Sequence, residues 1–176
     1  SRWVVDVTYF KANLEKEIFT AYDPETFLAS ALNSEDDSDR RGIELSLSAS
    51  ILDATDIAAG YTYLNSRDSD SRREVRRPQN SGFVRVTSMF HANRGTSALS
   101  YSYTGEQADS EFIYATLADR VDLDSYGLLD IDLGYKISES FTMFLSASNI
   151  LDTEYVEVFG YQSPGRALKL GVRATL

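Results

Sequence analysis

The segment NILDTEYVEVFGYQSPGRALKLGVRATL, residues 149–176, closes the sequence and decides how the rest of it is interpreted. Its first part is rich in turn-forming residues, and from residue 166 onward apolar and polar side chains alternate. The apolar positions are Leu168, Leu170, Val172, Ala174 and Leu176. A period of two predicts a β-strand whose two faces meet different surroundings. Because chains usually end in a few loose polar residues, we expect this strand to matter up to its last residue.

The same alternation recurs along the chain, whereas stripes with the helical period of 3.6 residues are absent from the sequence. In one segment, Leu129, Ile131 and Leu133 alternate with Asp130 and Asp132. The pattern predicts an all-β fold. The eight predicted strands span residues 2–20, 42–51, 57–66, 81–90, 96–104, 129–137, 141–149 and 166–176.

Long and short connections between these predicted strands alternate without exception. The short ones are residues 52–56, 91–95 and 138–140, and the long ones are 21–41, 67–80, 105–128 and 150–165. In an antiparallel up-and-down sheet this order places every long loop at one end. Outer-membrane barrels have this layout, with short periplasmic turns and long external loops, whereas a soluble sandwich has no reason to follow it. We therefore predict an antiparallel, up-and-down transmembrane β-barrel segment of about eight strands.

Composition limits the other classes of protein. The chain has 176 residues, 43% of them hydrophobic and 25% charged, and contains no apolar run long enough for a transmembrane helix. It has no cysteine and one histidine, His91, so disulfides, Cys-based metal sites and His-rich zinc sites are excluded. A net charge of −10 argues against nucleic acid as a partner. The first residues do not resemble a signal peptide, so we expect that one was removed or that the natural N-terminus lies upstream.

The register of the strands predicts which face meets lipid. A slip of one residue in the segment 129–137 would turn Asp130, Asp132 and Lys136 toward the bilayer. A Lys or Arg at the bilayer midplane costs about 2–4 kcal/mol, so we expect the apolar set to face lipid and the polar set to face water. A lipocalin-like soluble barrel would invert this arrangement, and alternation alone does not choose between the two.

Aromatic residues favour the membrane interpretation, because they gather near both ends of the predicted strands as in interfacial belts. Ordinary pairing of aromatic residues between strands is the alternative. Tyr61, Tyr63, Tyr101 and Tyr103 lie toward the long loops, and Trp3, Phe90, Tyr135 and Phe141 toward the short turns.

The last segment resembles the C-terminal end of TonB-dependent outer-membrane receptors, in which an Asn-Leu-Phe-Asp-like element precedes Tyr, Gly-Tyr, Pro-Gly-Arg and the closing strand. The segments RGIELSLSASILDATDIAAGYTYLNSRDSD (41–70) and VRRPQNSGFVRV (75–86) resemble barrel strands of the same family. The stretch VFGYQSPGR (158–166) is most similar to cobalamin-receptor-like members. The matching positions are Asn149, Asp152, Tyr155, Gly160, Tyr161, Pro164, Gly165 and Arg166.

The resemblance implies that residues 1–176 are the C-terminal portion of a barrel of about 22 strands, with the plug domain, the earlier strands and the TonB box outside this sequence. It implies TonB-driven uptake of cobalamin or a ferric siderophore across the bacterial outer membrane. The implied partners are outer-membrane lipid and lipopolysaccharide, the rest of the receptor, and TonB. The matching motif residues are expected to build the last external loop and closing strand, with Arg166 anchoring the loop. Family barrels usually end in an aromatic residue, and Leu176 departs from that pattern.

Two other functions compete with this interpretation. One is a standalone eight-strand barrel with a structural or adhesive role, since eight strands is also the smallest usual closed barrel. The other is an enzyme, for which His91 would have to act with a serine or carboxylate. His91 falls in a predicted short turn, where we expect it to be solvated, and Asp130 and Asp132 are expected to face a wet lumen. We therefore predict no catalytic residue, no cofactor and no metal, and the sequence names no ligand-binding residue.

Two charged segments also have alternative interpretations. The basic segment SRREVRR, residues 71–77, is expected to be a solvated loop, with contact to lipid phosphate or another anionic ligand as the alternative. The acidic run Glu35, Asp36 and Asp37 lacks EF-hand spacing, so a solvated loop is favoured over a calcium site.

Overall fold

A computed structural model of the chain describes residues 2–23, 25–26, 28–33, 37–68, 71–110 and 120–175. All regular structure within these residues is β-strand, as predicted. The strands are β1 (Arg2–Leu14), β2 (Ile18–Tyr22), β3 (Ala29–Asn33), β4 (Ser38–Leu52), β5 (Thr55–Arg67), β6 (Asn80–Phe90), β7 (Gly95–Thr104), β8 (Gln107–Ser110), β9 (Arg120–Leu123), β10 (Tyr126–Lys136), β11 (Phe141–Ser148) and β12 (Ala167–Ala174).

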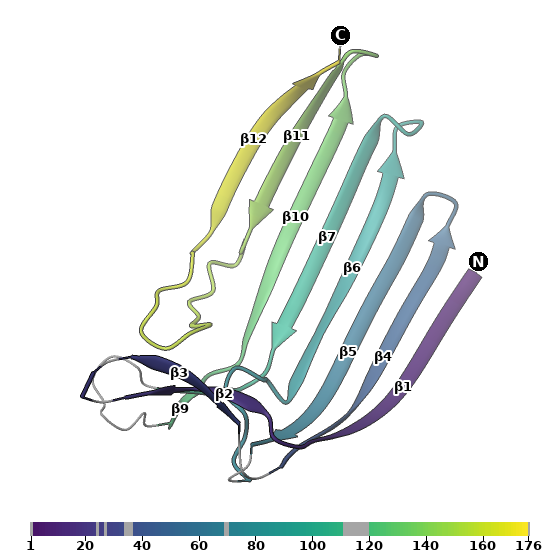
Figure 1. Ribbon diagram of the computed structural model, residues 1–176. Helices are drawn as coiled ribbons and strands as arrows, with labels where there is room; N and C mark the ends of the chain where they lie inside the picture. The colour runs from purple at the N-terminus through teal and green to yellow at the C-terminus, as the bar shows by residue number, and fades with distance from the viewer. Residues whose placement is uncertain are drawn as a thin grey trace.

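Eight of these strands form one antiparallel sheet in the order β1-β4-β5-β6-β7-β10-β11-β12. Figure 1 shows them as a curved wall, with the tight turns at the end where the C-terminus lies and hairpin β2–β3 at the opposite end. The predicted alternation of short and long connections is therefore confirmed. Among the described residues, no helix is long and apolar enough to cross a membrane.

The long connections contain structure that the sequence interpretation missed. The first predicted strand, 2–20, is wrong in extent, because β1 ends at Leu14 and a turn with Lys16 at φ 54° separates it from β2. β2 pairs with β3, and β8 pairs with β9, as two small antiparallel sheets outside the main one. The predicted loops 21–41 and 105–128 thus contain strands of their own.

Backbone pairing aligns side chains of one kind into rows that cross the whole wall. One row takes an apolar residue from each of the eight strands: Trp3, Ala49, Ile57, Val86, Leu99, Ile131, Ala147 and Leu168. The adjacent row, on the opposite face, holds small, polar or charged residues throughout: Arg2, Ser50, Asp56, Thr87, Ala98, Asp132, Ser146 and Lys169. Since successive side chains of a strand point to opposite faces, the wall has one apolar and one polar face.

The apolar face is not packed into a core. Within the described residues the only buried hydrophobic side chains are Ala49, Ala98, Ala108 and Leu123, whereas Leu168 is 70% exposed and Val5 is 66% exposed. A soluble barrel would bury such residues, because water-exposed apolar surface costs about 25 cal/mol per Å². The exposed apolar face fits contact with lipid and does not fit the packed interior of the lipocalin-like alternative.

Aromatic residues lie at both ends of the apolar face. Near the short turns, the rings of Phe90 and Tyr135 lie 6.4 Å apart. Near the long loops, the Tyr61 hydroxyl donates a hydrogen bond of 2.7 Å to Asn80. Rings on the apolar side with polar atoms turned to the strand ends are typical of membrane interfaces.

Phenylalanine rings cover glycines of the neighbouring strand on the polar face. The cross-strand pairs are Phe10 with Gly42, Phe83 with Gly60, and Phe144 with Gly171. A Cβ at Gly60 would lie 2.5 Å from a Phe83 ring carbon, so no larger residue fits beneath the ring. In each pair the ring lies where a glycine side chain would begin, an arrangement also used in designed sheets to support glycine in a strand.

The wall does not close on itself. β1 and β12 are the two ends of the strand order, and in the described ranges no backbone pairing joins them. An unpaired backbone group in hydrocarbon costs several kcal/mol, so both edges need a partner strand in a membrane. The standalone eight-strand barrel therefore disagrees with the structure.

The two faces predict opposite responses to one substitution. In the complete barrel, Leu99→Arg should lower the free energy of unfolding by about 2–4 kcal/mol, because it places a cation on the lipid face near mid-strand. Ser100→Arg, on the polar face of the same strand, should change it by less than about 1 kcal/mol. Urea unfolding in phospholipid vesicles measures both, and equal losses would contradict the assignment of the faces.

Candidate functional site

The long connections meet at one end of the wall, where charged side chains join them. Arg40, near the start of β4, reaches both the turn after β1 and the connection between β5 and β6. Its Nη2 donates to Glu17 at 2.5 Å and to Glu74 at 2.8 Å, and its Nε adds a bond of 3.0 Å to Glu74. The Ser38 hydroxyl donates a further bond of 2.6 Å to Glu17. One guanidinium thus holds two loops against the strand ends.

Glu74 is the more enclosed partner, with its side chain 10% exposed. Besides Arg40, it accepts a hydrogen bond from the Ser66 hydroxyl and pairs with Arg77 Nε at 2.5 Å. Burial acts to raise the pKa of Glu74, but the bonds from Arg40 and Ser66 and the two arginine charges outweigh it and lower that pKa. Glu74 is therefore ionised at neutral pH.

Asp109, in β8, joins three segments that are distant in the sequence, and its side chain is fully buried. Its Oδ1 accepts hydrogen bonds from Arg76 Nε at 2.9 Å and from the Ser110 amide at 2.8 Å. Its Oδ2 accepts a hydrogen bond of 2.8 Å from the amide of Phe159, in the connection between β11 and β12, the last loop. The Arg76 amide also donates to the Ala108 carbonyl at 2.7 Å. This carboxylate holds the β5–β6 connection, hairpin β8–β9 and the last loop together.

Asp109 remains ionised although its side chain is buried. Burial acts to raise the pKa of this carboxyl, whereas the amides of Phe159 and Ser110 and the guanidinium of Arg76 lower it, and the net shift is downward. A carboxylate held by several N–H donors is stabilised in its ionised form. Asp109 therefore stays ionised at neutral pH and keeps all three contacts.

The basic segment 71–77 is largely exposed, as expected of a solvated loop, and its arginines also form ion pairs within the chain. Its four arginines each lie within 4 Å of a carboxylate from the loops. The pairs are Arg72 with Asp68 at 3.6 Å, Arg73 with Glu106 at 3.4 Å, Arg76 with Asp109 at 2.9 Å, and Arg77 with Glu74 at 2.5 Å. Arg72 and Arg77 pair within the β5–β6 connection, whereas Arg73 and Arg76 reach carboxylates of the connection after β7, so the segment ties these two loops together.

The motif residues Asn149 and Asp152 form the base of the last loop, the connection between β11 and β12. Asn149 is 3% exposed and adopts a left-handed φ of 48°. Its side chain accepts the Thr153 amide and donates to the Thr153 carbonyl, both at 2.9 Å, while its own amide donates to Asp130 at 2.8 Å. Asp152 also has a left-handed φ, of 56°. The asparagine closes a tight ring at the end of β11.

Asp152 and Arg166 bring the two ends of the last loop together. Asp152 accepts the Arg166 amide at 2.9 Å and Arg166 Nη2 at 3.2 Å. The amide bond and the charge of Arg166 hold the pKa of Asp152 below its usual value. Gly165 lies beside this pair, since a Cβ there would be 3.3 Å from Asp152 Oδ1.

The other motif residues lie farther along the loop. The ring of Tyr155 lies 4.6 Å from that of Tyr126 in β10, and burial raises the pKa of the Tyr155 hydroxyl. Gly160 adopts a φ of 81°, and Tyr161 is 72% exposed. The motif thus forms one cluster of Asn149, Asp152, Gly165 and Arg166, while Tyr155, Gly160, Tyr161 and Pro164 are not part of it.

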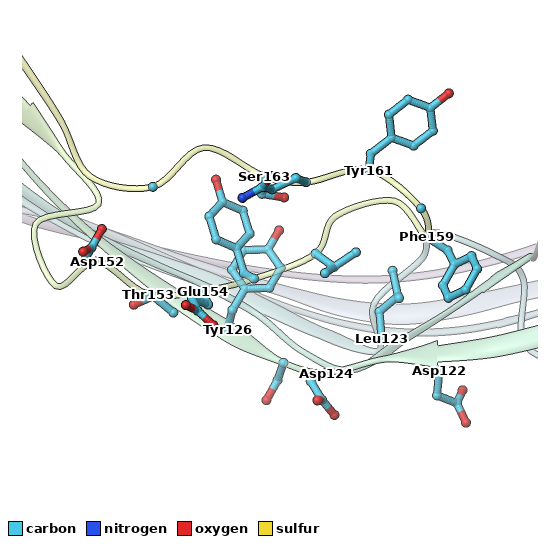
Figure 2. A pocket seen from close by; sticks show the side chains of 16 residues that line it. Asp122, Leu123, Asp124, Tyr126, Asp152, Thr153, Glu154, Phe159, Tyr161 and Ser163 are labelled. Atoms are coloured by element: carbon cyan, nitrogen blue, oxygen red, sulfur yellow. The ribbon is translucent and has the colours of Figure 1, made fainter.

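Two clefts flank the outer part of the last loop. One, of about 860 Å³, lies between this loop and the β9–β10 connection; Figure 2 shows Tyr126 within it and Phe159 and Tyr161 at the far end from Asp152. The other, of about 690 Å³, lies between the same loop and Arg76. Residues 159–163 line both. Because Asp109 binds the Phe159 amide, it sets the position of the segment that divides the clefts.

Two of the side chains considered for catalysis, His91 and Asp130, form contacts within the chain. His91 is not merely solvated as predicted, because its Nδ1 lies 2.5 Å from the Tyr135 hydroxyl and the two rings stack. Asp130 accepts the Asn149 amide. No group of three or more metal-binding side chains occurs in the part of the chain that the structure describes. Glu35 and Asp36, of the acidic run considered for calcium, lie outside the described residues.

The sequence interpretation missed Arg40, Glu74 and Asp109. The sequence could have indicated an ion pair at Glu74, since it is the single carboxylate among four arginines in residues 71–77. No feature of the sequence pointed to Asp109, because its partners Arg76 and Phe159 lie 33 and 50 residues away.

Comparison with known proteins identifies relatives. The family described as TonB dependent receptor-like, beta-barrel, matches residues 1–150. The vitamin B12 transporter BtuB of Vibrio cholerae is 32% identical over 76 residues, which cover 43% of this chain and 12% of the transporter. The pyoverdine receptor FpvA of Pseudomonas aeruginosa PAO1 aligns over 99% of this chain and 27% of its own, with a TM-score of 0.78 and 17% identity. The ferric-catecholate import receptor Fiu of E. coli K12 aligns over 98% and 25%, with a TM-score of 0.73 and 18% identity.

The chain is thus similar to about a quarter of each solved receptor, and its matched part spans 12% of the curated transporter. The copper transporter OprC has the same fold, with a TM-score of 0.74 and 14% identity. Identities this low show the fold alone. The similar proteins are named for different cargos, so the shared fold does not select one.

Replacement of Asp109 should release the last loop. Asp109→Ala leaves the Phe159 and Ser110 amides and Arg76 without their acceptor. We therefore expect the free energy of local opening of the last loop to fall by about 2–3 kcal/mol. Hydrogen exchange at Phe159 in the full-length receptor measures this. Because the folded-state pKa of Asp109 is lowered, its contribution is complete above about pH 4 and is lost as pH falls further. Asp122→Ala, an exposed carboxylate of β9, is the control; unchanged protection in the Asp109 variant would contradict this role.

Asn149 should tolerate glycine better than alanine. Asn149→Ala loses the ring of hydrogen bonds and also strains the left-handed backbone, whereas Asn149→Gly loses only the hydrogen bonds. We expect the alanine variant to be less stable than the glycine variant by about 1 kcal/mol. Thermal unfolding of both variants beside the parent measures the difference, and the reverse order would exclude a conformational role.

Proposed function

Because the chain belongs to the TonB-dependent receptor β-barrel family of the bacterial outer membrane, we propose that residues 1–176 are the C-terminal portion of a transporter barrel. The predicted family and location are confirmed by its relatives. The observation that carries the proposal is the open wall, with an unpaired edge at β1 and another at β12. Strands from the remainder of a receptor would satisfy both edges.

The cargo of this transporter is a large, scarce ligand, cobalamin or a ferric siderophore. The match to the vitamin B12 transporter BtuB supports the first, and the structural likeness to FpvA and Fiu is compatible with the second. The clefts beside residues 159–163 provide room for contact with such a ligand at the external end. Asn149, Asp152, Gly165 and Arg166 act structurally, by holding the last loop and the closing strand in place.

The remaining partners follow from the two faces of the wall. The apolar face contacts membrane lipid and lipopolysaccharide, and the polar face surrounds the lumen that holds the plug. TonB drives transport through the N-terminal part of the receptor, outside this sequence. The wall itself carries out no chemical reaction, and its side chains need no cofactor.

The experiment is uptake by the full-length receptor that contains this chain. It is expressed in cells lacking their own receptors, with and without TonB, and supplied with cyanocobalamin or with a panel of ferric siderophores that includes ferripyoverdine. We expect at least one probe to accumulate, and accumulation to require TonB. TonB-independent accumulation would contradict the proposal, and so would the failure of a folded receptor at the cell surface to accumulate cyanocobalamin or any ferric siderophore of the panel.

A further inference from the structure

Two cations face each other on the apolar side of the wall, at its external end. The backbone register pairs Lys11 of β1 directly with Arg41 of β4. Both positions are exposed. Directly opposed side chains have Cβ atoms about 4.5–5.5 Å apart, and like charges in that arrangement destabilise a sheet. The pair therefore needs a counter-charge.

The described part of the chain supplies no such counter-charge. Neither Lys11 nor Arg41 forms an ion pair or a side-chain hydrogen bond with a described residue. This contrasts with the arginines of residues 71–77, each of which has a carboxylate partner. Asp39 lies on the same face one step beyond Arg41, but its partners in the register are Asn13 and Arg67.

The position of the pair matches the level of lipid headgroups. The next residues toward the membrane on this face are Tyr9 on β1 and Ile43 on β4, which are paired with each other and are 67% and 41% exposed. Lys11 lies eight residues beyond Trp3, which is about 27 Å of strand. At a tilt of about 40° this is about 21 Å along the membrane normal, near the apolar height of about 25 Å.

From this juxtaposition we propose that Lys11 and Arg41 bind a phosphate group of lipid A, the lipid part of lipopolysaccharide, on the outside of the barrel. A phosphate between the two side chains removes their repulsion and accepts hydrogen bonds from both. The inference deepens the lipid contact of the proposed function by naming the site, and it rests on the outward direction of the apolar face.

The test measures binding of diphosphoryl lipid A to the full-length receptor in neutral detergent, at fixed salt, by native mass spectrometry. We expect the double variant Lys11→Gln/Arg41→Gln to bind about 30-fold more weakly, which corresponds to about 2 kcal/mol. The exchange Lys11→Arg/Arg41→Lys keeps both charges and should bind within about threefold of the parent. Retention of the folded band on unheated gels shows that each variant barrel has formed.

The matched control is Lys169→Gln/Arg173→Gln, which removes one Lys and one Arg from the polar face of β12. It should leave lipid A binding unchanged. Parent-like binding by the Lys11/Arg41 variant, or an equal loss in the control, would overturn the site. Competition by millimolar inorganic phosphate as effective as that by lipid A would overturn the assignment to a lipid. The assay uses neither cargo nor TonB, so its result is independent of the uptake experiment.

Discussion

A bilayer core offers no hydrogen bonds, and this constraint explains most of the structure. Every strand in the wall must pair on both sides, and the outer face must be apolar where it lies in the hydrocarbon. The row from Trp3 to Leu168 is apolar in all eight strands. The adjacent row, with Asp56, Asp132 and Lys169, is polar, as a water-filled lumen allows. A slip of one residue in any strand would exchange these rows. The same constraint makes the two unpaired edges untenable in isolation.

Outside the bilayer, charged side chains hold the loops together. Arg40 holds Glu17 and Glu74, and Arg76 with Asp109 continues the connection to the Phe159 amide. These bonds join successive external loops. Glu74 and Asp109 are enclosed and multiply bonded, conditions in which charge-assisted hydrogen bonds are strong. The loops, and the clefts beside residues 159–163, therefore keep a defined position relative to the wall.

The strands of the wall could be predicted from the sequence because the alternation of apolar and polar residues lies within each strand. Alternation within each segment identified all eight wall strands, and the lengths of the connections identified their order. Hairpins β2–β3 and β8–β9 were missed because short paired segments inside polar loops carry little alternation. Within the motif, Asn149 and Arg166 lie where a loop base was expected, yet the sequence could not reveal that Asp109 holds the loop tip. That contact joins residues 50 positions apart and depends on the folded path of three loops.

The orientation of the wall is the central claim, and the absence of cysteine from the chain allows a direct measurement. Single cysteines placed along β7 in the full-length receptor would carry spin labels, and their relaxation by oxygen and by a water-soluble nickel complex would be compared in bilayers. Oxygen should dominate at positions 97, 99, 101 and 103, and the nickel complex at 98, 100 and 102, with a strict period of two. Labels at 99 and 101 shielded from both reagents, or an inverted pattern, would contradict a lipid-facing apolar surface.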